Sequence, residues 1–209
     1  MDFKSPDRIS MEHEKFVNSA VFVLIIPYKV KPYDLILIRR TKRENDKHSG
    51  EISFPGGKYD PTLDSSYLDT AKRELKEELG IELLNENILG CIDDHLTPKG
   101  FIITPFVAFI QQDQQMIKQD AEVKKILKIP ITFFINKENY KERTYTLKGD
   151  TVSVGKYNYK SPQNGKRYVI FGATSHIIVN FIERVYNIIL KTAGCRRINC
   201  EDIENKIIK

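Results

Sequence analysis

The stretch that decides the fold is residues 52–81, which read ISFPGGKYDPTLDSSYLDTAKRELKEELGI. A short apolar run ends there at a glycine pair, Gly56-Gly57, whose bare backbone suits a turn. A helix is predicted over about residues 65–79, because serines can cap its start and Gly80 can end it. Its apolar residues recur at helical spacing, so one face of the helix is expected to pack against a core.

The predicted helix also carries three acids at helical spacing. Glu74, Glu77 and Glu78 stand at positions i, i+3 and i+4 and share one edge of the helix. Like charges at this spacing repel, and more strongly when they lose water, so a hard divalent cation is expected among them. The Gly56 carbonyl can approach such an ion, and Arg73 can orient a glutamate. A solvated acidic face is the alternative interpretation.

Strands and helices alternate over the rest of the chain. Runs rich in β-branched and aromatic residues predict strands at 18–28, 33–38, 52–54, 88–92, 102–110, 126–129, 144–147, 151–157 and 167–171. A short helix is expected after Pro130, and a final helix over about 174–191. This mixture indicates α/β or α+β layering around one core.

Composition limits the class of protein and its partners. The chain has 209 residues, 41% hydrophobic and 29% charged, which excludes a disordered polar chain. Its net charge of +5 favours anionic partners but carries no nucleic-acid signature. Without a long apolar run or a secretory signal, a cytoplasmic protein with no membrane partner is expected. The expected organisation is an extension (1–16), one domain (17–192) and a tail (193–209).

Residues 73–81 also carry a family resemblance. They match every specified position in the second half of the Nudix box, Arg-Glu-hydrophobe-any-Glu-Glu-any-Gly-hydrophobe. The resemblance implies a Nudix fold, a mixed β-sheet sandwiched between α-helices. It also implies hydrolysis of a nucleoside diphosphate linked to another moiety, with Mg²⁺ or Mn²⁺. The first half departs from the box: fifteen residues instead of thirteen separate Gly57 from Arg73, and Asp60 and Asp64 are the nearest acids to its missing glutamate.

The longer loop with spaced aspartates resembles the coenzyme A diphosphatase branch of the superfamily. Further resemblance to this branch lies in residues 38–41, 48–57, 97–107, 122–131 and 168–175. It implies cleavage of coenzyme A or acyl-coenzyme A to 3′,5′-ADP and (acyl-)4′-phosphopantetheine. Two alternatives stay open. One is a Nudix hydrolase acting on ADP-ribose, NADH or a dinucleoside polyphosphate, and the other is a non-catalytic nucleotide-binding module.

Roles for individual residues follow from this resemblance. Glu74 and Glu78 are the first metal ligands, with Glu77 and the Gly56 carbonyl next, and Glu122 is either a ligand or a general base. Arg39 and Arg40 belong to a basic run that suits the 3′-phosphate of coenzyme A or is a solvated loop. A small-molecule nucleotide is the expected partner, and a homodimer stays open. The expected site comprises catalytic Glu77, Glu122 and Arg73; metal-binding Glu74, Glu78, Glu77 and Gly56; and substrate-binding Arg39, Arg40, His48 and Gly57.

Overall fold

A large mixed sheet, sheet A, forms the centre of the molecule. The computed structural model describes residues 8–42, 49–196, 198–200, 202 and 203. Within them, eight strands form sheet A, in the order β3-β2-β1-β7-β5, with β4 on β1, β6 on β7 and β8 on β2. β1 and β7 run parallel and the other pairs are antiparallel. Its strands are β1 (Val17–Ile26), β2 (Asp34–Arg40), β3 (Ile52–Ser53), β4 (Gly56–Lys58), β5 (Ile88–Cys91), β6 (His95–Leu96), β7 (Phe101–Phe109) and β8 (Val123–Pro130).

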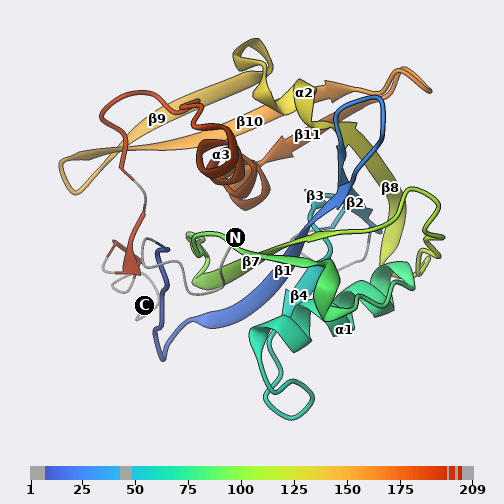
Figure 1. Ribbon diagram of the computed structural model, residues 1–209. Helices are drawn as coiled ribbons and strands as arrows, with labels where there is room; N and C mark the ends of the chain where they lie inside the picture. Colours follow the sequence, from blue (N-terminus) through green and yellow to red (C-terminus); the bar gives the residue numbers. More distant parts are fainter. Residues whose placement is uncertain (1–7, 43–48, 197, 201, 204–209) are drawn as a thin grey trace.

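Sheet A lies between two helices, α1 (Tyr67–Leu79) on one face and α3 (Gly172–Tyr186) on the other (Figure 1). Neighbouring residues of β1 pack in hydrophobic cores on opposite faces of sheet A. Phe22 packs in the core with α1, whereas Val23 packs in the core with α3. This alternation is the period of two expected of a strand buried on both faces. The structure therefore confirms the predicted mixed sheet between helices.

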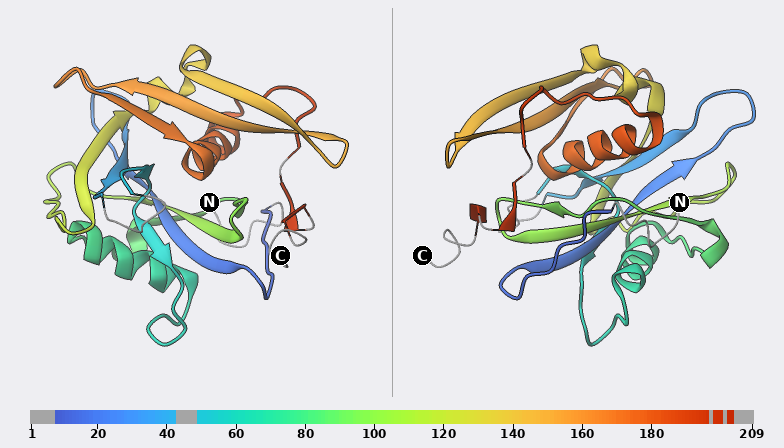
Figure 2. Two further views of the ribbon diagram at one scale, coloured as in Figure 1. Left: turned by 180° about the vertical axis from the view of Figure 1, so that it is seen from behind. Right: turned by 60° about the vertical axis from the view of Figure 1, so that its left-hand side comes forward.

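A second sheet covers the side of α3 that faces away from sheet A (Figure 2). Its antiparallel strands are β9 (Tyr140–Leu147), β10 (Asp150–Lys160) and β11 (Arg167–Phe171), with β10 in the middle. Short helices precede it: α2 (Ile131–Ile135) and the 3₁₀ turn η2 (Lys137–Asn139), while η1 (Asn85–Asn87) precedes β5. Because α3 has a sheet on either side, Phe181 of α3 and Tyr157 of β10 are almost fully buried.

The helix ends test the predicted caps. The Ser66 side chain accepts a hydrogen bond from the Asp69 N–H at the start of α1, and Gly80 ends the helix with φ 66°. The final helix stops at Tyr186 instead of continuing to 191, because Asn187 takes the left-handed conformation with φ 54°. No described helix has the length and apolar character needed to cross a bilayer.

Both described chain ends pack against the central domain. Arg8 forms an ion pair with Asp94, which also accepts a hydrogen bond of 2.8 Å from the Met11 N–H. Phe16 is buried in a small cluster that also contains Ile203 from the other end of the chain. The segments before and after the predicted domain thus contribute to its described surface and to a minor core.

Candidate active site

The candidate site lies where α1 passes the glycine pair of β4. β1 pairs with β2 over only three residues. Nearer its start β1 pairs with β4 instead, and nearer its end β2 pairs with β3. The predicted turn at the glycines is therefore partly wrong, since Gly56–Lys58 is a strand. Gly56 has φ 144°, and a Cβ there would stand 2.2 Å from the Ala20 carbonyl oxygen, so no side chain fits. Its N–H donates a 2.9 Å hydrogen bond to Glu78.

Glu78 is the most buried acid of α1, with 1% of its surface exposed. Burial raises the pKa of Glu78 to about 8, although the hydrogen bond from Gly56 opposes this shift. The charges of Glu74 and Glu122 raise this pKa further, and the charge of Arg40 lowers it. Three carboxylates therefore influence one another here, which is an arrangement that favours a bound cation.

Glu74 lies against the second glycine of the pair. A Cβ on Gly57 would stand 2.3 Å from the Glu74 carboxylate, so the glycine leaves room for this group. Burial raises the pKa of Glu74, and a 2.8 Å hydrogen bond from Arg73 opposes the shift. Glu77 is different: its side chain is 53% exposed, and Arg73 reaches it at 3.3 Å. The helix edge predicted from the spacing thus has two sheltered acids and one at its solvent side.

Asp64 is a site residue to which the sequence reasoning assigned no role. It is buried, and it accepts hydrogen bonds from Arg73 and from the Thr70 hydroxyl. The bonds from Arg73 lower the pKa of Asp64 to about 2, although burial opposes them. Asp64 belongs to the long loop that lacks the first glutamate of the Nudix box. This missing glutamate was the sequence feature that could have pointed to a role for Asp64.

Glu122 is brought to the site by a loop that is bonded to the end of α1. The Ile117 N–H donates to the Leu79 carbonyl at 2.8 Å, and the Gln119 N–H donates to the Glu78 carbonyl at 3.0 Å. These carbonyls lie in the last turn of the helix, where intrahelical donors are missing. The Glu122 N–H in turn donates to the Gln119 carbonyl. The loop therefore places Glu122 relative to the acids of α1.

The predicted substrate-binding arginines face opposite sides of sheet A. Arg40 is in register with Val123, which belongs to the core beside α1, and its charge acts on Glu78. Arg39 is in register with Ile52, which belongs to the core beside α3. His48 lies outside the described residues. Of the substrate-binding set, the structure thus places Arg40 and Gly57 beside the acids of α1.

The donor set suits a hard cation. Its members are carboxylate oxygens, two of them sheltered, beside a glycine pair that brings bare backbone close, which is the chemistry that Mg²⁺ or Mn²⁺ prefers. Among the described residues no group of three acidic, histidine or cysteine side chains converges closely enough to enclose an ion. Glu74 and Glu78 are each hydrogen-bonded to a protein donor, Arg73 and the Gly56 N–H. Each of these bonds uses one oxygen, Oε1 of Glu74 and Oε2 of Glu78, which leaves the second oxygen of each carboxylate for a cation.

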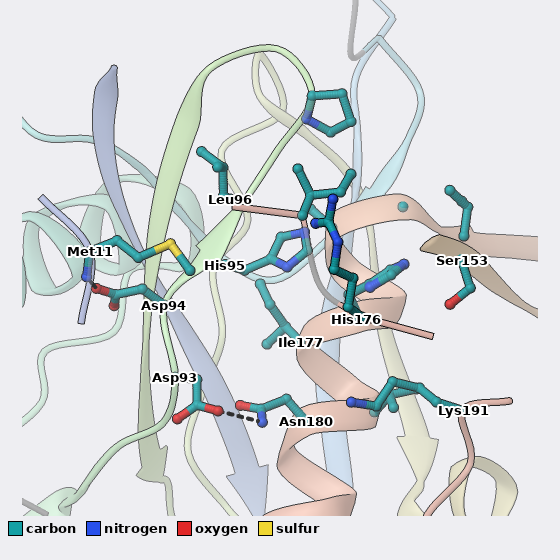
Figure 3. Close-up of a pocket in the computed structure, with 17 residues that line it drawn as sticks. Met11, Asp93, Asp94, His95, Leu96, Ser153, His176, Ile177, Asn180 and Lys191 are labelled. Atoms are coloured by element: carbon teal, nitrogen blue, oxygen red, sulfur yellow. Dashed lines mark hydrogen bonds between the residues drawn. The ribbon is translucent and has the colours of Figure 1, made fainter. Parts of the chain in front are cut away.

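A cavity of about 120 Å³ lies elsewhere, between α3, β6, β10 and the chain ends (Figure 3). His95 of β6 and His176 of α3 line it, with ring centroids 5.2 Å apart. Asn180 lines its wall and donates a 3.1 Å hydrogen bond to Asp93. The cavity opens on the α3 side of sheet A, and no acid of α1 lines it. The carboxylates, and not this cavity, therefore mark the candidate active site.

The elements of the candidate site lie within a match to a known family. The NUDIX domain family matches residues 18–134, which include the glycine pair, α1 and Glu122. A peroxisomal coenzyme A diphosphatase of Mus musculus is 28% identical over 164 residues, covering 78% of this chain and 69% of that protein. The uncharacterized Nudix hydrolase NudL of Photorhabdus laumondii is 27% identical over 168 residues, covering 80% and 86%. These similarities confirm the predicted resemblance to the coenzyme A diphosphatase-like branch.

A solved structure supports the fold. The crystal structure of a MutT/nudix family protein from Enterococcus faecalis superimposes with a TM-score of 0.56 and 22% identity. The superposition covers 87% of this chain and 66% of that one. The likeness therefore extends beyond sheet A and α1 to most of the chain.

Proposed function

This chain belongs to the NUDIX domain family, and we propose that this Nudix hydrolase cleaves the diphosphate bond of coenzyme A or acyl-coenzyme A. The products are 3′,5′-ADP and 4′-phosphopantetheine or its acyl form. The proposal is supported by the similarity to the mouse coenzyme A diphosphatase and by the branch-like loop between Gly57 and Arg73. The main structural support is the buried Glu78. It accepts a hydrogen bond from the Gly56 N–H, and the charges of two further carboxylates act on it.

The acids of the site have a proposed role as ligands. Glu74 and Glu78 would hold Mg²⁺ or Mn²⁺, with Glu77 and the Gly56 carbonyl as further oxygen donors. When bound, such a cation supplies compensation for the charge of the two phosphates and a more acidic water. Arg73 keeps Glu74 and Glu77 in place through its hydrogen bonds. The protein therefore mainly positions groups and balances charge, as phosphoryl transfer requires.

The proton and the leaving group complete the proposed reaction. Glu122 accepts a proton from water, whose oxygen forms a bond to one phosphorus of the diphosphate. The bond from that phosphorus to the bridging oxygen breaks, and the electron pair leaves with the oxygen on the second phosphate. Arg40 offers positive charge beside Glu78 for the phosphate oxygens. One water is consumed, and two phosphate monoesters are released.

A substrate panel tests this proposal. We expect the purified protein with Mg²⁺ or Mn²⁺ to cleave coenzyme A faster than ADP-ribose, NADH or diadenosine polyphosphates. Mass spectrometry should identify 3′,5′-ADP and 4′-phosphopantetheine as products. If ADP-ribose were turned over while coenzyme A stayed intact, the substrate assignment would be wrong. Tight nucleotide binding without hydrolysis of any substrate would instead support a non-catalytic module.

A further inference from the structure

Two cations face each other on the α3 side of sheet A. Arg39 of β2 and Lys125 of β8 are register partners in antiparallel strands, which places their side chains on one face. The same face contains Ile52, the partner of Arg39 on its other side, which belongs to the core beside α3. Like charges directly opposite in a sheet destabilise it. An anion between them would remove this repulsion.

Within residues 8–42 and 49–196, no acid provides that anion. Among the described residues, neither Arg39 nor Lys125 forms an ion pair, and the side chain of Arg39 makes no hydrogen bond. Both side chains are partly buried, so they are not simply extended into solvent. A guanidinium carries five donors arranged to match carboxylate or phosphate oxygens. The donors of Arg39 are therefore available to a ligand.

Tyr168 of β11 lies close to one of these two cations, Lys125. The Lys125 ammonium lies 5.6 Å from the centre of the Tyr168 ring. Burial by itself raises the pKa of Tyr168, but hydrogen bonds with Lys125 and Asn164 and the charges of Lys125 and Lys166 lower it overall. The hydroxyl thus adds a neutral polar group at the edge of the cationic face.

This face adjoins the candidate active site. Arg39 is followed directly by Arg40, which faces α1 and acts on the charge of Glu78. Because the two arginines face opposite sides of sheet A, a substrate that contacts both has to pass around the end of β2. We propose that Arg39 and Lys125 bind a phosphate monoester that the nucleotide substrate carries in addition to its diphosphate. This inference rests on the proposed function, because coenzyme A carries such a group at its 3′ position.

Paired substrates test the role of the extra phosphate. The steady-state kinetics of wild type, Arg39→Gln and Lys125→Gln are measured on coenzyme A and on 3′-dephospho-coenzyme A. We expect each variant to raise KM for coenzyme A by about tenfold, as the loss of a charge-assisted hydrogen bond implies. KM for the dephosphorylated substrate and both kcat values should stay within about twofold of wild type. Lys141→Gln, at an exposed lysine of β9, is the matched control.

The outcomes separate this inference from the proposed function. Equal KM changes on both substrates, or no change on either, would overturn the phosphate site. If wild type cleaved neither substrate, the proposed function would be wrong. The phosphate site would then be tested by measuring ligand binding. For this, adenosine 3′,5′-bisphosphate and AMP are titrated calorimetrically without metal. Wild type should bind the bisphosphate about fivefold or more tightly than AMP, and Arg39→Gln should remove the difference. Equal affinities in wild type would reject the site.

Discussion

Arg73 holds Asp64 through two parallel hydrogen bonds, from Nε to Oδ1 at 2.9 Å and from Nη2 to Oδ2 at 3.0 Å. The remaining terminal nitrogen of the same guanidinium donates to Glu74 and Glu77. Because Thr70 also donates to Asp64, the loop after the glycine pair is tied to the first half of α1. The loop thereby fixes the arginine, and the arginine fixes the glutamates.

Asp64→Asn should lower the free energy of unfolding at pH 7 by about 1–2 kcal/mol, because Arg73 loses one of its three charged partners and solvent screens this pair only in part. The pKa of Asp64 is lowered from 3.8 to about 2 in the folded protein. Its stabilising contribution is therefore complete above about pH 4 and is lost as the pH falls toward 2. Urea unfolding at several pH values measures the effect.

The exposed Asp113→Asn variant is the control for this series and should unfold like wild type. The difference between wild type and Asp64→Asn should shrink steadily below pH 4. A difference that stayed constant down to pH 2.5, or one absent at pH 7, would contradict the assigned ion pair.

Glu78→Gln should reduce turnover by about a hundredfold or more, since several kcal/mol of charge stabilisation depend on a bound cation. In the metal-free folded protein the pKa of Glu78 is raised to about 8, so this acid takes up a proton on folding at pH 7, and the amide, which has the same shape, avoids that cost. The free energy of unfolding of the metal-free protein should therefore be unchanged or raised. Glu82→Gln, at an exposed acid paired with Lys76, should retain full activity. Wild-type activity in Glu78→Gln would refute the ligand role.

Alanine substitutions at the two glycines should have different effects. In Gly57→Ala the new Cβ meets the end of the flexible Glu74 side chain, which can move aside. We expect turnover to fall about tenfold or more with a loss of unfolding free energy below about 1 kcal/mol. In Gly56→Ala the Cβ meets the backbone of Ala20 at a φ of 144°, so a loss of about 3 kcal/mol or more is expected. Thermal unfolding and kinetics on both variants separate the two effects, and similar stability losses would contradict this reasoning.

Glu122→Gln should lower kcat by about a hundredfold, because general-base catalysis contributes this much or more. Affinity for Mn²⁺, measured by titration calorimetry, should change much less than in Glu78→Gln. The comparison distinguishes the two roles that the sequence left open for Glu122. An equal loss of Mn²⁺ affinity in both variants would make Glu122 a ligand instead of a base.

Local signals explain which elements were predictable from the sequence. The ends of α1 follow from Ser66 and Gly80, which lie beside the residues they cap. β4 could not be found in this way, because glycines carry no strand pattern and their partners on β1 are distant in the sequence. At the site, helical spacing placed three acids on one edge but could not show that Glu77 would be half exposed. Lys125 was missed, since its relation to Arg39 exists only through strand register.

The two adjacent aspartates after β5 make residues 8–11 part of the folded unit. Asp93 accepts from the Ile9 N–H and pairs with Arg184 of α3, while Asp94 pairs with Arg8. Both aspartates are almost fully buried. A protein shortened to begin at residue 17 would open these carboxylates to water and leave Asp94 without its cation. Shortened versions chosen by domain boundaries alone are therefore expected to be less stable, although α3 keeps its ion pair from Arg184 to Asp93.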